Sequence, residues 1–283
     1  MAPAARALQN SVFVDCTASS DISYKYLNLF EHGYSVVASN KITFAAPYEQ
    51  YKKLKTSAVE NGVSLKYETT VGAALPILES ISRSVNSGDG ILSIEAVLSG
   101  TMNYIFSSYK GGEDGKTFAQ IVRLAQEAGY SEPDPRLDLS GRDVLRKLLI
   151  LAREAGADID EKDVQIDPVL GPEFFEGKVP EFFKKMEENE AKFAASYKEA
   201  ADKGLRQRFV ASLISERDES GNVVFKAAMG LKNVGPEHPL YSLCGTDNAA
   251  IIGTEFYPSP LVVQGAGAGA YQTASGVLND ILM

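Results

Sequence analysis

The sequence predicts an α/β protein with a small parallel sheet and a second, α+β part that has an open mixed sheet. Three observations support this fold class. Apolar strand-like segments alternate with helical segments over residues 11–70, and the middle of the chain has strands followed by helices and a hairpin. Residues 259–283 return to a strand, a glycine-rich turn and a helix. Such alternation is typical of parallel strands with right-handed crossovers.

The N-terminal part is expected to alternate strictly. Asp21 is a suitable N-cap for the first helix and Gly33 a suitable stop. A doubly wound nucleotide-binding sheet normally opens with a strand and a glycine-rich turn, and no such turn precedes Ser11. We therefore expect either a small sheet or a chain that begins partway through a domain. The predicted elements are a strand at 11–17, a helix at 21–33, a strand at 34–41, a helix at 47–62 and a strand at 63–70.

The middle of the chain has a different character. Residues 91–106 are interpreted as a strand that runs into a turn at 99–101, and residues 117–129 as a helix with a glycine stop. Residues 180–204 form a charged amphipathic pattern that predicts one exposed helix. Residues 207–230 are typical of a hairpin that turns at 218–221.

A dense group of charges precedes an apolar helix at 140–156. Ser140 is a suitable N-cap, with Asp143 three residues later and Gly156 as the stop. Lys147 lies on the apolar side of this helix, one turn after Asp143. One interpretation is an exposed ion pair worth about 0.2–0.5 kcal/mol. The other is a partly desolvated lysine at the rim of a cleft, tuned by Asp143 for proton transfer.

The C-terminal glycines allow two interpretations. Gly265, Gly267 and Gly269 separate a strand from the last helix. They could let an anion approach the helix N-terminus, or they could serve close packing between strand and helix.

Bulk properties exclude several classes of protein. The 283 residues carry a net charge of −9 without a basic patch, which argues against nucleic-acid binding. No apolar run has the length of a membrane span, and the N-terminus lacks the apolar core of a signal peptide, so a cytoplasmic location is expected. Two distant cysteines, Cys16 and Cys244, form no metal-ligand spacing. With only two histidines, proton chemistry is expected to depend on lysines and carboxylates.

Several separate stretches resemble homoserine dehydrogenase, and together they span the chain from Ser11 to its C-terminal end. The most specific is GYSEPDPRLDLSGRDVLRK at 129–147. The others are SNK at 39–41, YETTVGAALP at 67–76, LSGTMNYIF at 98–106, GTDNAAII at 245–252 and VVQGAGAGAYQTASGV at 262–277.

The resemblance implies NAD- or NADP-dependent interconversion of L-homoserine and L-aspartate 4-semialdehyde, and it implies roles for individual residues. Lys147 matches the catalytic lysine, Asp143 its carboxylate partner and Lys41 a second lysine near substrate and cofactor. The residues matching the substrate site are Glu132, Asp138, Thr101, Gly100 and Tyr130. Those expected to meet the cofactor are Thr17, Ser19, Lys41, Gly265, Gly267 and Gly269.

The resemblance also implies a site for a monovalent cation, Na⁺ or K⁺. Its ligands would be the carboxylate of Glu68 and the backbone carbonyls of Val71, Ala73 and Leu75. Oxygen ligands suit a hard cation. The residues alone favour a simpler interpretation, in which Glu68 caps backbone N–H groups at a buried turn.

The resemblance gives a domain plan and leaves the activity of this chain open. Residues 1–66 would be the remnant of a truncated Rossmann-like dinucleotide-binding domain, 67–262 the catalytic and dimerisation domain, and 263–283 a helix that returns to the first domain. Because the glycine-rich phosphate loop and the NAD/NADP selector are missing, weak or no dinucleotide binding is expected. The chain could be a truncated product or part of a longer polypeptide such as an aspartokinase fusion.

Three functional interpretations remain. The chain is the enzyme or its catalytic part, a non-catalytic substrate-binding and dimerisation fragment, or a relative acting on another small aldehyde or keto acid. The third is poor, because Cys16 and Cys244 lack the setting of a catalytic thiol. A homodimer is expected through the apolar strand segments at 91–100 and 222–231.

Overall fold

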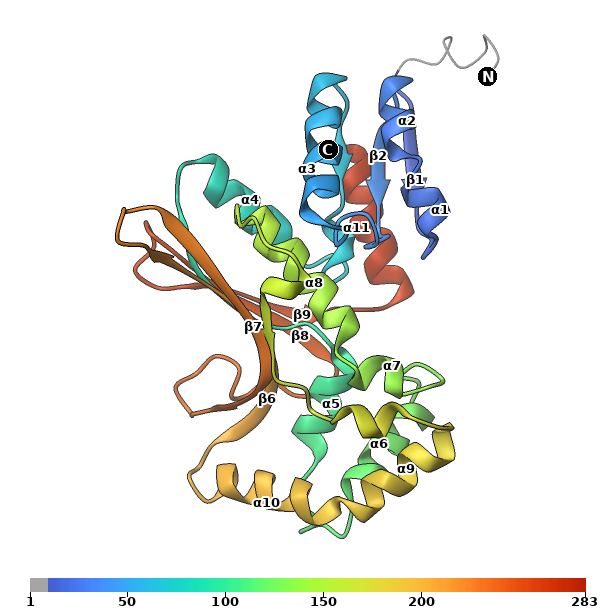
Figure 1. Cartoon of the computed structure of the whole chain (residues 1–283), viewed down its shortest axis with the longest axis vertical. Helices are drawn as coiled ribbons and strands as arrows, with labels where there is room; N and C mark the ends of the chain where they lie inside the picture. The colour runs from blue at the N-terminus through green and yellow to red at the C-terminus, as the bar shows by residue number, and fades with distance from the viewer. Residues whose placement is uncertain (1–9) are drawn as a thin grey trace.

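The computed structural model describes residues 10–283 and contains two separate sheets (Figure 1). The first is a parallel sheet of strands β1 (Val12–Asp15), β2 (Ser35–Ala38) and β3 (Leu65–Lys66), in that order. Helices α1 (Ser20–Ser23) and α2 (Tyr26–Glu31) connect β1 to β2, and α3 (Tyr48–Glu60) connects β2 to β3. The predicted parallel strand–helix alternation is confirmed.

Two predicted boundaries in this part are wrong. The helix expected at 21–33 is divided into α1 and α2, and its N-cap is Ser19, whose hydroxyl accepts a hydrogen bond from the backbone N–H of Ile22. The strand expected at 63–70 pairs only over two residues, because the chain turns into the 3₁₀ helix η2 (Glu68–Thr70).

The second sheet is mixed, as predicted, and has the order β5-β7-β6-β4-β8-β9. Only β5 and β7 are parallel neighbours, and the other pairs are antiparallel. The long hairpin of β6 and β7 confirms the hairpin expected at 207–230. The strands are β4 (Ile91–Val97), β5 (Val164–Ile166), β6 (Arg206–Arg217), β7 (Val223–Val234), β8 (Asp247–Thr254) and β9 (Leu261–Ala266).

Helices cover one face of this sheet and bury its core. Helix α4 (Ile77–Asn86) packs on β4 and β8, and α8 (Arg142–Glu154) packs on β6 and β7. Ile94, Leu213 and Leu148 are fully buried where these layers meet. The remaining helices are α5 (Gly100–Ser108), α6 (Phe118–Glu127), α7 (Arg136–Leu139), α9 (Val179–Glu188), α10 (Glu190–Ala201) and the 3₁₀ helices η3 (Glu161–Asp163) and η4 (Pro172–Phe175).

Three further predictions need correction. Strand β4 ends at Val97, and the segment expected to be a turn is the start of α5, capped by the Ser99 hydroxyl. The helix expected at 180–204 is two helices that meet at Asn189. Its first half is not a solvated face, since it buries Phe182, Phe183 and Met186.

The C-terminal helix α11 (Ala270–Leu282) leaves the second sheet after β9 and packs against β2 and η2 of the first part (Figure 1). A methyl group on Gly276 would lie 2.5 Å from Thr69 Cγ2, so the two segments are in close contact. Asp280 accepts a hydrogen bond from the backbone N–H of Glu68 at 3.1 Å. The first sheet is therefore held by residues from the opposite end of the chain.

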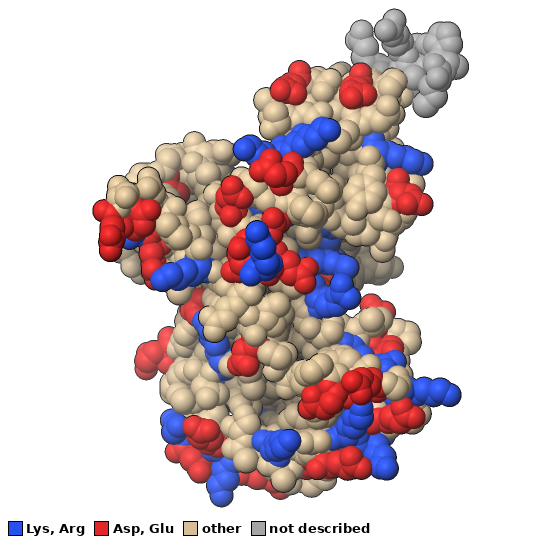
Figure 2. All heavy atoms as spheres, in the orientation of Figure 1, with Lys and Arg blue, Asp and Glu red and all other residues tan. Residues whose placement is uncertain are grey.

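The visible surface carries acidic and basic side chains interspersed over most of its area (Figure 2). No helix among residues 10–283 is long and apolar enough to cross a membrane.

Candidate functional site

Asp143 lies between two lysines that come from different parts of the chain. On the first turn of α8, its Oδ2 lies 2.8 Å from Lys147 Nζ, and its Oδ1 lies 3.5 Å from Lys41 Nζ. Lys41 follows β2 of the first sheet, so this carboxylate joins the two parts of the molecule. The structure thus brings together three residues that the sequence comparison assigned to catalysis.

Lys147 is withdrawn from solvent and firmly held. Its side chain is only 12% exposed, and its ammonium donates a hydrogen bond of 2.7 Å to the carbonyl oxygen of Leu98. Burial lowers the pKa of Lys147, and the neighbouring charge of Asp143 opposes that effect without cancelling it. Of the two interpretations of this residue, the partly desolvated lysine matches the structure and the exposed ion pair does not.

The surroundings of Asp143 favour its ionised, carboxylate form. Burial acts to raise its pKa, but the charges of Lys147 and Lys41 outweigh burial, and the pKa of Asp143 lies below its ordinary value. Two ammonium groups therefore share one negative charge.

A second polar group adjoins this cluster. Thr101 Oγ1 lies 2.6 Å from the carbonyl oxygen of Tyr130 and 2.8 Å from Asp138 Oδ1, and its single proton can serve one acceptor at a time. Asp138 Oδ2 accepts the backbone N–H of Glu132 at 2.9 Å. The charge of Asp138 also acts on the pKa of Lys147, so the two groups are neighbours.

The remaining predicted substrate residues flank these groups. Glu132 is exposed, and its carboxylate forms no hydrogen bond within residues 10–283. The Tyr130 ring is half exposed and meets Tyr104 edge-on, with centroids 5.0 Å apart. Gly100 is required at the start of α5, because a methyl group there would lie 2.8 Å from the carbonyl oxygen of Thr246.

The predicted N-cap of α8 is displaced by one residue. Gly141 holds the N-cap position with φ of 72°, and a side chain there would lie 2.7 Å from Met229 Cε. The Ser140 hydroxyl instead accepts a 3.4 Å hydrogen bond from the N–H of Arg142. A left-handed glycine in close contact with β7 overrides the usual preference for serine.

The residues expected to meet a cofactor divide into two places. Thr17 and Ser19 lie in the loop after β1, where the Ser19 carbonyl oxygen accepts a hydrogen bond from the side chain of Asn40, the residue before Lys41. Gly265 belongs to β9 rather than to the turn, which corrects the predicted boundary. A methyl group on Gly267 would overlap Asn248, and Gly269, with φ of 127°, precedes α11. Close packing is thus sufficient to explain Gly267.

The predicted cation turn is buried at Val71 and Ala73 and half-buried at Glu68 and Leu75. Each carboxylate oxygen of Glu68 accepts one backbone N–H of helix α4, from Leu78 at 2.9 Å and Glu79 at 2.7 Å. Burial raises the pKa of Glu68 to about 7. Gly72 and Ala73 both have positive φ, 77° and 54°. The capping predicted for Glu68 is observed, and its carboxylate retains lone pairs for a cation.

Two contributors to the site had no clear signal in the sequence. The carbonyl of Leu98 is a backbone group that any residue would supply. Asp15 lies near the end of the strand predicted at 11–17, which is a common place for a polar residue, yet it is 1% exposed and bonded to Asn40.

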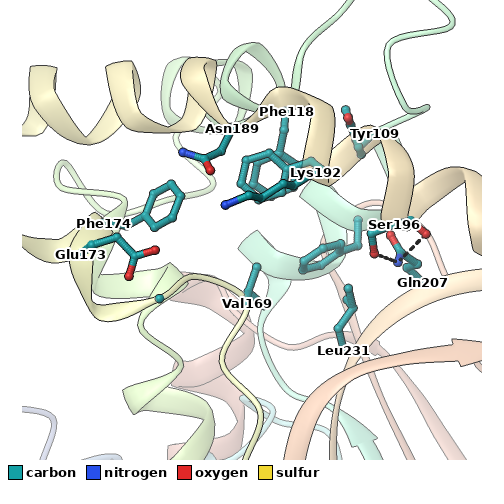
Figure 3. A pocket seen from close by; sticks show the side chains of 13 residues that line it. Tyr109, Phe118, Val169, Glu173, Phe174, Asn189, Lys192, Ser196, Gln207 and Leu231 are labelled. Carbon is teal, nitrogen blue, oxygen red and sulfur yellow. Dashed lines mark hydrogen bonds between the residues drawn. The ribbon is translucent and has the colours of Figure 1, made fainter.

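A cavity lies apart from the charged residues Lys41, Asp143 and Lys147 and is lined by none of them. It has a volume of about 280 Å³ and opens between α10, the η4 segment and β6 (Figure 3). Its lining is aromatic, with Phe118 and Phe193 stacked at 4.4 Å, and Lys192 and Glu173 lie at its exposed rim. The Ser196 hydroxyl accepts a 2.9 Å hydrogen bond from Gln207 at one side.

The chain resembles curated proteins over nearly its whole length. It is 39% identical over 275 residues to a bifunctional aspartokinase/homoserine dehydrogenase of Buchnera aphidicola, covering 96% of this chain and 32% of that protein. It is 36% identical over 271 residues to bifunctional aspartokinase/homoserine dehydrogenase 2 of Escherichia coli, covering 95% and 32%. The chain spans about a third of the length of these relatives.

Solved structures share the fold. A Candida auris protein of unknown function superposes with a TM-score of 0.89 at 35% identity, covering 98% of this chain and 76% of that one. A hyperthermophilic archaeal homoserine dehydrogenase in complex with NADPH gives a TM-score of 0.70 at 25% identity, covering 96% and 70%. The homoserine dehydrogenase family model matches residues 76–282. With most of its length and its two-sheet architecture accounted for in this way, the chain belongs to the homoserine dehydrogenase family.

Proposed function

We propose that this chain carries the substrate site of an NAD(P)-dependent oxidoreductase that interconverts L-homoserine and L-aspartate 4-semialdehyde. The single observation that carries the proposal is the state of Lys147. It is a buried ammonium, bonded to one carbonyl and one carboxylate, with a lowered pKa.

Lys147 has the properties of a proton donor to a developing alkoxide. Its ammonium has three N–H groups, of which Leu98 and Asp143 accept two. The third is available to a substrate oxygen. In aldehyde reduction NADPH or NADH supplies a hydride, and the carbonyl oxygen gains negative charge. A nearby ammonium stabilises that charge and delivers a proton, and a lowered pKa favours the delivery.

Carboxylates account for recognition of the amino acid. The substrate has an α-ammonium, and Glu132 and Asp138 provide negative charge beside Lys147. Asp138 is oriented by Thr101 and by the Glu132 backbone, and its oxygens retain lone pairs for a further donor. Glu132 has a free, exposed carboxylate, which suits a contact made only when substrate binds.

The cofactor residues are assigned by the same proposal. Thr17, Ser19 and Lys41 lie after β1 and β2, at the carboxyl end of a parallel sheet, where ligands of open α/β folds bind. Gly267 and Gly269 precede α11, and Gly265 lies in β9, the strand before it.

The cation and the dimer complete the proposal. Glu68 is a half-buried carboxylate whose pKa is raised by burial, and Na⁺ or K⁺ held with the carbonyls of Val71, Ala73 and Leu75 would stabilise its charged form. On the sheet face away from α8, three strands each carry an exposed apolar residue: Ile214 on β6, Val224 on β7 and Val262 on β9. This face is the proposed homodimer contact.

An alternative is a non-catalytic substrate-binding and dimerisation fragment. It is favoured by one observation: β1 is the edge of a three-stranded sheet, and the loop that follows it, at 16–19, contains no glycine. Such a loop provides none of the close backbone approach that a dinucleotide phosphate requires.

Two measurements on the purified chain separate these functions. Calorimetric titration with NADP⁺ and NADPH measures cofactor affinity, and an assay with L-homoserine and NADP⁺ measures turnover. Turnover that Lys147→Ala abolishes, in a variant that melts like the wild type, supports the enzyme. Substrate binding without turnover and without cofactor binding supports the fragment.

A further inference from the structure

The carboxylate of Asp15 is a buried anion at the carboxyl end of β1. It is 1% exposed, and its oxygens accept hydrogen bonds from the Thr17 N–H at 2.8 Å, the Tyr26 hydroxyl at 2.5 Å and Asn40 Nδ2 at 3.0 Å. Burial acts to raise its pKa, but these hydrogen bonds outweigh burial and lower it. Within residues 10–283 it has no cationic partner at salt-bridge distance. An ion kept inside a protein without a counter-charge depends entirely on its hydrogen-bond donors.

Asn40 connects this anion to the loops after both strands. Its Nδ2 group donates to Asp15 and also to the carbonyl oxygen of Ser19 at 2.9 Å, and its Oδ1 accepts the backbone N–H of Ile42 at 3.1 Å. The side chain is 2% exposed, so water does not compete for these bonds. The residue between the two bonded positions, Lys41, therefore has its backbone fixed on both sides.

The side chain of Lys41 extends from this fixed point to Asp143, which belongs to the other part of the molecule. A lysine side chain loses much conformational entropy when it is ordered in an ion pair. A mobile backbone at Lys41 would increase that loss. Lys147 does not share this dependence, because Leu98 and Asp143 hold it from within its own part.

From these contacts we infer that Asp15 and Asn40 form a clamp that positions Lys41 against Asp143. The inference rests on the proposed function in giving Lys41 a role at the substrate. The same carboxylate fixes the N–H of Thr17, in the loop expected to meet the cofactor. One buried anion thus sets the place of that loop and of Lys41 together. Asp15 and Asn40 are positioning residues, since neither reaches the charged cluster itself.

The test is competitive acylation of the lysines in the folded chain, read by mass spectrometry, with exposed Lys198 as the internal reference. Asn40→Leu keeps the size of the side chain and removes its three hydrogen bonds. The expected result is that Lys41 labels about two- to fivefold faster relative to Lys198, the range set by losing a solvent-accessible ion pair of ~0.5–1 kcal/mol. Labelling of Lys147 stays unchanged.

Tyr26→Phe is the control variant. It removes a different partner of Asp15 and leaves the Asn40 contact, so Lys41 labelling stays at the wild-type value. If Asn40→Leu does not fold, Asn40→Ser removes the link to Asp15 with a smaller change and has the same expected result.

The clamp is refuted if a folded Asn40 variant labels Lys41 at the wild-type rate, or if Lys41 and Lys147 change equally, since equal change indicates general loosening. Turnover is measured in parallel on the same samples. A selective change at Lys41 in a chain without turnover would contradict the proposed function and leave the clamp in place.

Discussion

Asp143 and Lys147 lie one helical turn apart, with their charged groups at 2.8 Å, and the carbonyl of Leu98, just after β4, accepts a second hydrogen bond from Lys147. Side chains four residues apart on a helix are neighbours, so this pair can form as soon as the helix does. The burial of Lys147, in contrast, depends on the tertiary packing around the helix. The pair is therefore local in sequence but depends on the whole fold for its environment.

Lys147→Ala is expected to lower kcat by about 10²- to 10⁴-fold, because it removes the proposed proton donor. Substrate affinity changes less, since Glu132 and Asp138 remain. Steady-state kinetics measure both. Arg146→Ala, an exposed change on the same helix, serves as the matched control and keeps wild-type kinetics. Comparable losses in the two variants would contradict the assignment.

Asp143→Asn is expected to move the alkaline limb of the kcat profile to lower pH. The charge of Asp143 raises the pKa of Lys147 against burial, so an amide leaves that pKa lower still. The lysine then loses its proton at a lower pH, and the acid form needed for reduction is lost earlier. A pH–rate profile of the reductive direction measures the shift. An alkaline limb that stays in place or moves upward would exclude Lys147 as its source.

Sodium or potassium is expected to raise the melting temperature of the wild-type chain. Binding to the folded state alone would stabilise it by about 2.7 kcal/mol at a cation concentration roughly 100 times the dissociation constant. Thermal melts in chloride salts of Na⁺, K⁺ and a large organic cation measure the difference. Glu68→Gln abolishes the selective effect, whereas Glu79→Gln, which removes the partner of Arg83, retains it. Equal responses to all three salts would leave Glu68 as a helix cap only.

Gly100→Ala is expected to destabilise the protein by about 1–3 kcal/mol, as for other overpacked positions. Its methyl group would lie 2.8 Å from the Thr246 carbonyl oxygen, which is backbone and cannot rotate away. Gly235→Ala is the control, because its methyl group would meet Leu205 Cδ2 at an ordinary 3.6 Å. Chemical denaturation measures both, and equal stability of the two variants would show that the α5 start can move.

Ile214→Asp is expected to convert a dimer into monomers, since it puts a charge at an exposed apolar position of the proposed contact face. Leu137→Asp, on exposed α7, changes charge equally and leaves the dimer intact. Sedimentation velocity reports the mass of each. A wild-type chain that sediments as a monomer at all concentrations would contradict the proposed contact.

Much of this architecture was predictable because it depends on local rules. The parallel crossovers follow from strand–helix alternation, and the placement of Lys147 beside Asp143 follows from helix periodicity. Other features depend on contacts that no local pattern encodes. Gly141 displaces Ser140 as the cap because β7 approaches it, and β9 extends through Gly265 because β8 supplies a partner strand. The break at Asn189 arises where two apolar faces turn toward different neighbours.

The site residues show the same division. Side chains with distinctive chemistry, such as Lys41 and Asp138, could be selected from the sequence by resemblance. The carbonyl of Leu98 could not, since every residue has one and only the folded chain aims it at an ammonium. Asp15 carried too little signal because its importance comes from three donors that converge on it from separate segments.

The seam between Gly276 and Thr69 has a practical consequence for anyone who edits this protein. Truncating α11 would first destabilise the N-terminal sheet, because α11 packs directly against β2 and η2. Exchanging the early strands between relatives would succeed only if the matching tail travelled with them. The first sheet and the C-terminal helix, although far apart in sequence, therefore have to be redesigned as one unit.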